Sequence, residues 1–174
     1  MVRAALSSRE GSFNRGAVTG AAYIPAASVI LASALATLPI VSVSGWWPNA
    51  GFLMLIAWRL LRADPWPAWW AAPMGFVNDL LTGAPIGLSV ALWSAVMLAM
   101  EWVDHRTQWR DYWVEWAIAT VLIAVDRWAD WQVAALAGAP VPFLHVLPAI
   151  VISILAFPLA ALIVSRTDRW RTGR

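Results

Sequence analysis

Long apolar runs, each closed by a polar or turn-forming segment, dominate the pattern of hydrophobic and polar positions along the chain. The six runs cover residues of about 21–43, 46–61, 66–81, 86–103, 112–136 and 141–165. Gly and Pro separate them, as in Thr82-Gly83-Ala84-Pro85 and Gly138-Ala139-Pro140, which is typical of turns between helices. Because the runs are continuous rather than alternating, they predict helices and not the strands of a barrel.

The lengths of the runs suit a bilayer, which a helix crosses with about 20 apolar residues and a range of roughly 17–25. The first run contains no charged residue, whereas the second is short and has Arg59 near its end. The third and fifth runs carry polar residues inside them: Asn78, Asp79, Asp126, Arg127 and Asp130. The sequence therefore predicts an all-α integral membrane protein with six transmembrane helices.

Composition supports this prediction and excludes other classes of protein. Hydrophobic residues make up 61% of the 174 positions and charged residues 13%, about half the share usual in soluble domains. One soluble core of this size could not bury so much apolar surface, and a disordered chain would be less hydrophobic. There is no cysteine, which excludes disulfides and thiolate metal sites.

The arginines predict how the helices are oriented. All 12 basic residues are arginine, and with six spans 11 of them fall on one side of the membrane. The positive-inside rule makes that side cytoplasmic, so both termini are expected in the cytoplasm. We expect a single membrane domain with a cytoplasmic arm over residues 1–20, a six-helix core over 21–165 and a basic cytoplasmic tail over 166–174. A signal peptide cleaved near Ala34-Leu35-Ala36 is the alternative for the first run.

Candidate catalytic chemistry is sparse. The sequence has no phosphate-binding loop, no nucleophile elbow and no zinc-protease motif. His105 and His145 fall on opposite sides of the predicted membrane and could not share a metal ion. We therefore expect no enzyme, no cofactor and no metal. The 14 tryptophans suit an aromatic belt at the two interfaces, and Trp93 is the best candidate for a tryptophan-lined ligand site.

The most informative segment runs from Gly75 to Gly87. Gly75, Asp79, Gly83 and Gly87 recur at every fourth position, and Asn78 lies beside Asp79. In the first part of the segment this spacing makes a small, partly polar stripe on one helix face, which favours close helix packing in lipid. Gly83 and Pro85 then end the helix.

Asp79 needs a partner, because a carboxylate near the C-terminal end of a helix is opposed by the helix dipole and is costly in lipid. Arg127, the one arginine outside the cytoplasmic set, is expected at a similar depth. Three interpretations follow: Asp79, Arg127 and Asp130 all reach the outer headgroups, or Asp79 pairs with Arg127 and joins the third and fifth helices, or the groups line a proton or solute pathway. Asp130 could also pair locally with Arg127, three residues away.

The pattern G-F-x-x-D-L-L-x-G-x-x-x-G, from Gly75 to Gly87, resembles the bacterial rod shape-determining membrane protein family MreD. Pro48-Asn49, leading into the apolar run that ends at Arg59, resembles the second span of that family. Asp126 falls where the family often carries an aspartate. The resemblance covers nearly the whole chain, although Arg127 has no counterpart in the family pattern.

This resemblance implies a non-enzymatic scaffold of the machinery for lateral peptidoglycan synthesis, in the bacterial inner membrane. The implied partners are MreC and, through it, MreB, RodA and a penicillin-binding transpeptidase, together with the lipid bilayer and without nucleic acid. A homo-oligomer is left open. The family is also similar in fold to the substrate-binding subunits of energy-coupling-factor transporters, so the alternative function is a membrane subunit that binds a vitamin-like solute.

Overall fold

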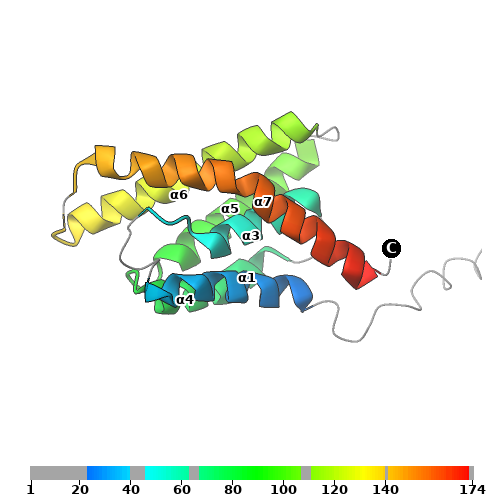
Figure 1. Ribbon diagram of the computed structural model, residues 1–174, viewed down its shortest axis with the longest axis horizontal. Helices are drawn as coiled ribbons and strands as arrows, with labels where there is room; N and C mark the ends of the chain where they lie inside the picture. Colours follow the sequence, from blue (N-terminus) through cyan, green and yellow to red (C-terminus); the bar gives the residue numbers. More distant parts are fainter. Residues whose placement is uncertain (1–22, 40–45, 63–66, 107–110, 140, 173–174) are drawn as a thin grey trace, which may run out of the picture.

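The computed structural model describes residues 23–39, 46–62, 67–106, 111–139 and 141–172, and within them it shows six α-helices and no strand (Figure 1). The helices are α1 (Ile24–Ala34), α3 (Ala50–Leu61), α4 (Ala71–Thr82), α5 (Leu88–Arg106), α6 (Tyr112–Leu136) and α7 (Leu147–Thr172). Short 3-10 turns follow α1 and precede α4 and α7: η1 (Leu35–Thr37), η2 (Ala68–Trp70) and η3 (Phe143–His145). The predicted all-helical fold class is confirmed.

Each of the six apolar runs corresponds to one of these helices. The fifth helix has the predicted bounds, whereas α1 ends earlier than the first run. The expected N-terminal arm over 1–20 lies outside the described residues. At the other end of the chain, α7 continues through most of the expected basic tail and ends at Thr172.

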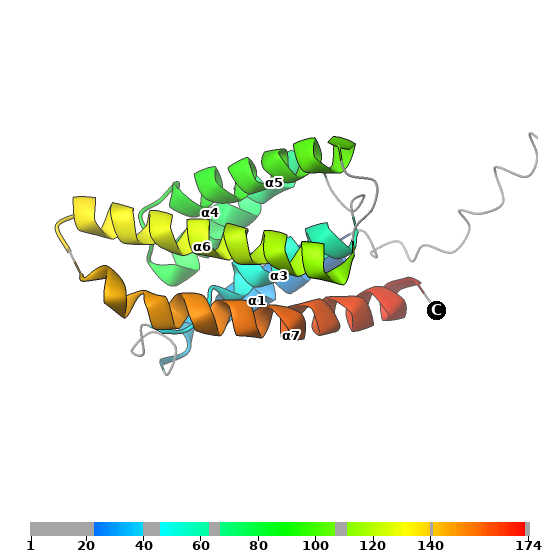
Figure 2. The same cartoon turned by 90° about the horizontal axis from the view of Figure 1, so that it is seen from above.

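The short helix α3 forms the centre of the bundle. All of its residues from Gly51 to Leu60 are buried, and α1 and α7 supply most of the packing around it (Figures 1 and 2). A helix that is apolar on nearly all of its sides is typically buried, and α3, whose one charged residue is Arg59, agrees with this rule. Trp58, fully buried on α3, donates a hydrogen bond from Nε1 to Oγ of Ser28 on α1 at 2.8 Å.

The ends of the helices gather at the two ends of the bundle. The start of α3, the α4–α5 connection and the α6–α7 connection lie at one end, which we call the Gly83 end (Figures 1 and 2). The start of α1, the end of α3 and the end of α7 lie at the other, which we call the Arg62 end. This alternation agrees with the predicted order of up and down helices.

Ion pairs join α3 to α7 at the Arg62 end. Nε of Arg62 donates to Oδ2 of Asp168 at 3.0 Å, and Nη2 of Arg171 donates to Oδ1 of the same carboxylate at 2.7 Å. The guanidinium of Arg171 also lies 5.9 Å from the ring centre of Trp58. Burial raises the pKa of Asp168, but hydrogen bonds from Arg171 and Arg62 outweigh it, so this pKa lies below its ordinary value.

The helices differ in length and hydropathy, the two properties that decide whether a helix can cross a bilayer. Within the described part of the chain, the helix Phe143–Arg171 alone is long and apolar enough to do so by length and composition. The helices Ile24–Thr37, Ala50–Leu61 and Leu88–Val103 are apolar but shorter. The six-helix architecture is therefore present, while the crossing of a membrane by all six helices stays a prediction.

Candidate functional site

The α4–α5 connection depends on two glycines with positive φ. Gly83 ends α4 in the left-handed region at φ 69°, and Gly87 precedes α5 at φ 101°. Residues with a Cβ rarely adopt such backbone angles, so the two glycines allow the chain to turn sharply from one helix into the next. The predicted break of the helix at Gly83 is confirmed.

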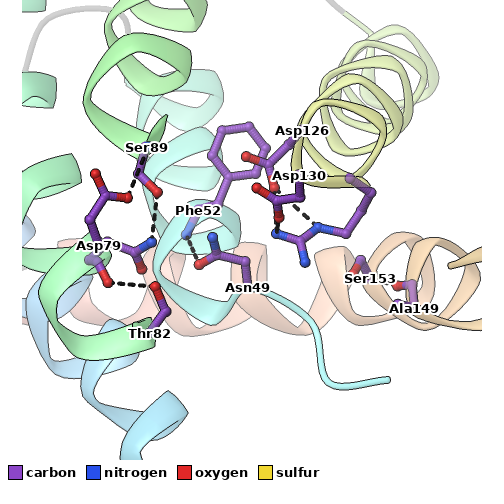
Figure 3. Close-up of polar contacts among 11 residues, drawn as sticks. Asn49, Phe52, Asp79, Thr82, Ser89, Asp126, Asp130, Ala149 and Ser153 are labelled. Atoms are coloured by element: carbon purple, nitrogen blue, oxygen red, sulfur yellow. Dashed lines mark hydrogen bonds and ion pairs between the residues drawn. The ribbon is translucent and has the colours of Figure 1, made fainter. Parts of the chain in front are cut away.

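This sharp turn places backbone amides beside the carboxylate of Asp79. Its Oδ2 accepts a hydrogen bond from the backbone N–H of Gly87 at 2.8 Å. Its Oδ1 accepts one from the backbone N–H of Ser89 at 3.0 Å (Figure 3). The carboxylate, only 1% exposed, thus satisfies amides at the positive end of the α5 dipole. The carboxylate of Asp79 is therefore opposed by the dipole of α4 but stabilised by the dipole of α5.

The predicted ion pair between Asp79 and Arg127 is wrong. Nη2 of Arg127 lies 2.8 Å from Oδ2 of Asp126 and 2.5 Å from Oδ2 of Asp130, both on its own helix (Figure 3). The local pairing with Asp130, three residues away, is therefore confirmed. The error has a physical reason: a buried carboxylate needs hydrogen-bond donors, and backbone amides supply them as well as a guanidinium does.

The interpretation that Asp79, Arg127 and Asp130 all reach the outer headgroups is also wrong for Asp79, which is buried. Asp126 is 3% exposed and faces the start of α3, while Asp130 and Arg127 are partly exposed (Figure 3). The three side chains form a cluster, which we call the α6 triad: Asp126, Arg127 and Asp130. It brings two carboxylates and one guanidinium to the Gly83 end.

The small stripe on α4 packs against α5 as predicted. A Cβ added to Gly75 would lie 2.7 Å from the carbonyl carbon and oxygen of Ser89 and 2.8 Å from the backbone nitrogen of Val90. Only glycine permits this approach of the two backbones. One turn later, Nδ2 of the buried Asn78 donates to Oγ of Ser89 at 2.9 Å, which adds a polar contact between the same helices.

A cavity of about 370 Å³ opens between these elements at the Gly83 end. It lies among α1, α3, α4, α5 and α6, and both Arg127 and Asp130 line it. Such a volume falls in the range of roughly 300–1,000 Å³ typical of small-molecule sites. Its other polar lining residues are Ser33, Asn49, Asn78, Thr82 and Ser89.

Two buried oxygen atoms in the wall of this cavity are unsatisfied. Oγ of Ser33 and Oδ1 of Asn78 have no hydrogen-bond partner among the described residues, although the two side chains are 2% and 1% exposed. Both lie against Gly51, where an added Cβ would be 2.0 Å from Oγ of Ser33 and 3.2 Å from Oδ1 of Asn78. Buried oxygens without partners are uncommon and point to a ligand or solvent site.

Sequence reasoning missed part of this site. Ser33 is not among the predicted site residues, and neither Trp47 nor Asn49 was assigned to a ligand site. For Asn49 there is a signal for a structural role, because an asparagine directly before an apolar run favours a helix N-cap. Its Oδ1 accepts from the backbone N–H of Phe52 at 3.2 Å. Trp93, the expected ligand-site tryptophan, instead packs in the core with its ring centre 6.1 Å from that of Phe52.

A second cavity, of about 280 Å³, lies near the Arg62 end between α3, α6 and α7 and is mainly apolar. It includes Leu61, Trp116 and Phe157. Within the described residues, no group of three or more His, Asp or Glu side chains is placed to hold a metal ion. The polar cavity is therefore the stronger candidate site.

Comparisons with protein-family models, with curated proteins and with solved structures gave no match. The resemblance carried by Gly75 to Gly87 and by Asp126 thus stays a prediction from the sequence.

Proposed function

We propose that the protein is a non-catalytic, six-helix scaffold of the machinery for lateral peptidoglycan synthesis in the bacterial inner membrane. The proposal combines the sequence resemblance to the MreD family with the distribution of side chains in the bundle. In this proposal the Arg62 end faces the cytoplasm and the Gly83 end faces outward, since the arginine distribution favours that orientation.

The observation that carries the proposal is that the bundle exposes apolar side chains and buries charged ones. The middle of α7 exposes a row of large apolar side chains: Val151, Ile152, Leu155, Leu159, Leu162 and Ile163. In contrast, Arg59, Asp79 and Asp126 are buried. Soluble monomers rarely expose so large an apolar patch, whereas lipid-facing and partner-facing helices do.

Partner contacts in this proposal use helix faces. The connection between α4 and α5 is short, from Gly83 to Gly87, and most of the exposed large hydrophobic side chains lie on helices. The resemblance names MreC as the direct partner, with MreB, RodA and a penicillin-binding transpeptidase reached through it. Small side chains of α7 such as Ala149, Ser153 and Ala160 are buried inside the bundle, which leaves the opposite, apolar face for lipid or a partner helix.

Depletion in a rod-shaped host tests the proposed role. We expect cells to become round or swollen as lateral wall synthesis loses its scaffold, and expression of the wild-type chain should restore rods. The membrane fraction should retain MreC together with the protein after gentle solubilisation. Rods of normal shape after complete depletion would contradict the scaffold function.

A second candidate function, a solute-binding subunit of a transporter, is favoured by one specific observation. The cavity at the Gly83 end has convergent polar groups and two unsatisfied oxygens, which a scaffold does not need. Binding of a small solute to the purified protein, lost on substitution of a cavity residue, tests this candidate.

A further inference from the structure

The cavity at the Gly83 end has a definite chemical character. Two of the described charged side chains line it, the guanidinium of Arg127 and the carboxylate of Asp130, whereas Asp79 and Asp126 are buried and do not line it. The backbone amides of Gly87 and Ser89 satisfy Asp79, and Arg127 is shared by two carboxylates. The α6 triad therefore holds one more carboxylate than guanidinium, and its partly exposed member Asp130 lines the cavity.

The unsatisfied atoms add an independent requirement. Oγ of Ser33 and Oδ1 of Asn78 can both accept hydrogen bonds, and neither has a partner within the described part of the chain. Oδ1 of Asn78 can only accept, so a ligand that satisfies it must donate an N–H or O–H group, and Oγ of Ser33 is able to accept from such a ligand as well. Excess negative charge and acceptor oxygens together select a donor-rich cation.

An aromatic ring completes the arrangement. Trp47 lines the cavity and is 46% exposed, so part of this aromatic side chain is accessible there. Cations bind favourably over the face of a tryptophan ring. A ligand with a carboxylate is disfavoured, because Arg127, the guanidinium among the described lining residues, is already paired with Asp126 and Asp130.

We propose that the cavity lined by Ser33, Trp47, Asn78 and Asp130 binds the primary ammonium group of a small amine. The ammonium belongs either to a free amine or to the ethanolamine headgroup of a lipid, because both present the same three N–H donors. This inference rests on the second candidate function where the amine is free, and it gives the scaffold a lipid site where the amine is a headgroup.

Thermal unfolding of the full-length protein in detergent micelles tests the free-amine arm. Ethanolamine should raise the melting temperature in a saturable way, whereas choline, a cation without N–H donors, should act at least tenfold more weakly. Glycolate and ethylene glycol serve as the anionic and neutral probes of similar size. Nanodiscs of phosphatidylethanolamine, compared with phosphatidylcholine, test the lipid arm by the same readout.

Two cavity variants and one distant variant make the test specific. Asp130→Asn should weaken the effect of ethanolamine at least tenfold, and it leaves Arg127 paired with Asp126. Ser33→Ala, which only removes the hydroxyl, should weaken it several-fold and covers the case in which Asp130→Asn fails to fold. Asp111→Asn, an exposed carboxylate just before α6, should leave the effect unchanged.

The outcomes separate the ligand class from the function. Stabilisation by ethanolamine or by phosphatidylethanolamine that depends on Asp130 and Ser33 supports the proposal and identifies the source of the ammonium. Saturable stabilisation by glycolate or ethylene glycol alone overturns the ammonium class but leaves a solute-binding function. No stabilisation by any of these solutes and no preference between the two lipids overturns the inference, whereas the second candidate function is overturned only by its own binding test.

Discussion

At the residue scale, the buried carboxylates show which chemical needs the sequence reveals and which partners it hides. The sequence predicts that Asp79 requires a partner, because its place near the end of a helix is unfavourable. It does not show that backbone amides of Gly87 and Ser89 will meet the need, since these amides face Asp79 only after two glycines turn the chain. Ser33 was missed for a similar reason: its role depends on the close approach of Gly51 from another helix.

Substitution of Asp79 tests its capping role. Asp79→Ala should destabilise the protein by about 0.5–2 kcal/mol, the range for loss of a helix cap, and Asp79→Asn should cost less because asparagine also caps well. In a double-mutant cycle measured by unfolding in micelles, Asp79→Ala and Arg127→Ala should be additive within about 0.5 kcal/mol, because the two residues share no hydrogen-bond or ion-pair partner. If the double variant loses clearly less stability than the sum of the two single losses, Asp79 and Arg127 interact with each other and the ion pair exists.

At the element scale, hydrophobic periods and turn residues predict the helices well and their lengths less well. The run at 112–136 and α6 coincide, because a polar segment and a Gly-Ala-Pro turn bound it clearly. The sixth run ends at Ser165, where polar residues begin without a Gly or Pro, and α7 continues past this point to Thr172. Its extension is stabilised by contacts that are remote in sequence, namely the ion pair of Asp168 with Arg62 from the end of α3.

The link between α3 and α7 has a predictable pH dependence. Asp168 lies beyond the sixth predicted span, and its pKa is below the ordinary value of 3.8. The unfolded state therefore binds this proton more readily than the folded state, so the carboxylate contributes stability above the ordinary pKa and loses it as pH falls through the lower, folded-state pKa. Asp168→Asn should thus lower the melting temperature at neutral pH, and the difference from wild type should vanish in acid.

Melting curves recorded from neutral pH down to about pH 3 check this expectation. Asp111→Asn provides the comparison, because Asp111 is an exposed aspartate in the stretch before α6. A loss in Asp168→Asn that is equal at every pH would show that the carboxylate acts through its size and packing rather than its charge.

At the scale of the whole molecule, the bundle joins an apolar exterior to a polar cavity at one end. The apolar runs predict six helices, and the arginine pattern predicts that their ends alternate, which the arrangement of the helix ends matches. The cavity could not be predicted, because it is formed by five helices that meet only in three dimensions. The same limit applies to the α6 triad, whose members were identified but whose shared position beside α3 was not.

Topology mapping tests the central claim, a six-helix membrane protein with the Gly83 end outside and the Arg62 end in the cytoplasm. Paired reporters, one active only outside and one only inside the cytoplasm, are fused after Gly83, after Gly138, near Arg106 and after Arg166. The account predicts external activity after Gly83 and Gly138 and cytoplasmic activity near Arg106 and after Arg166. External activity after Arg166, or cytoplasmic activity at all four positions, would contradict it.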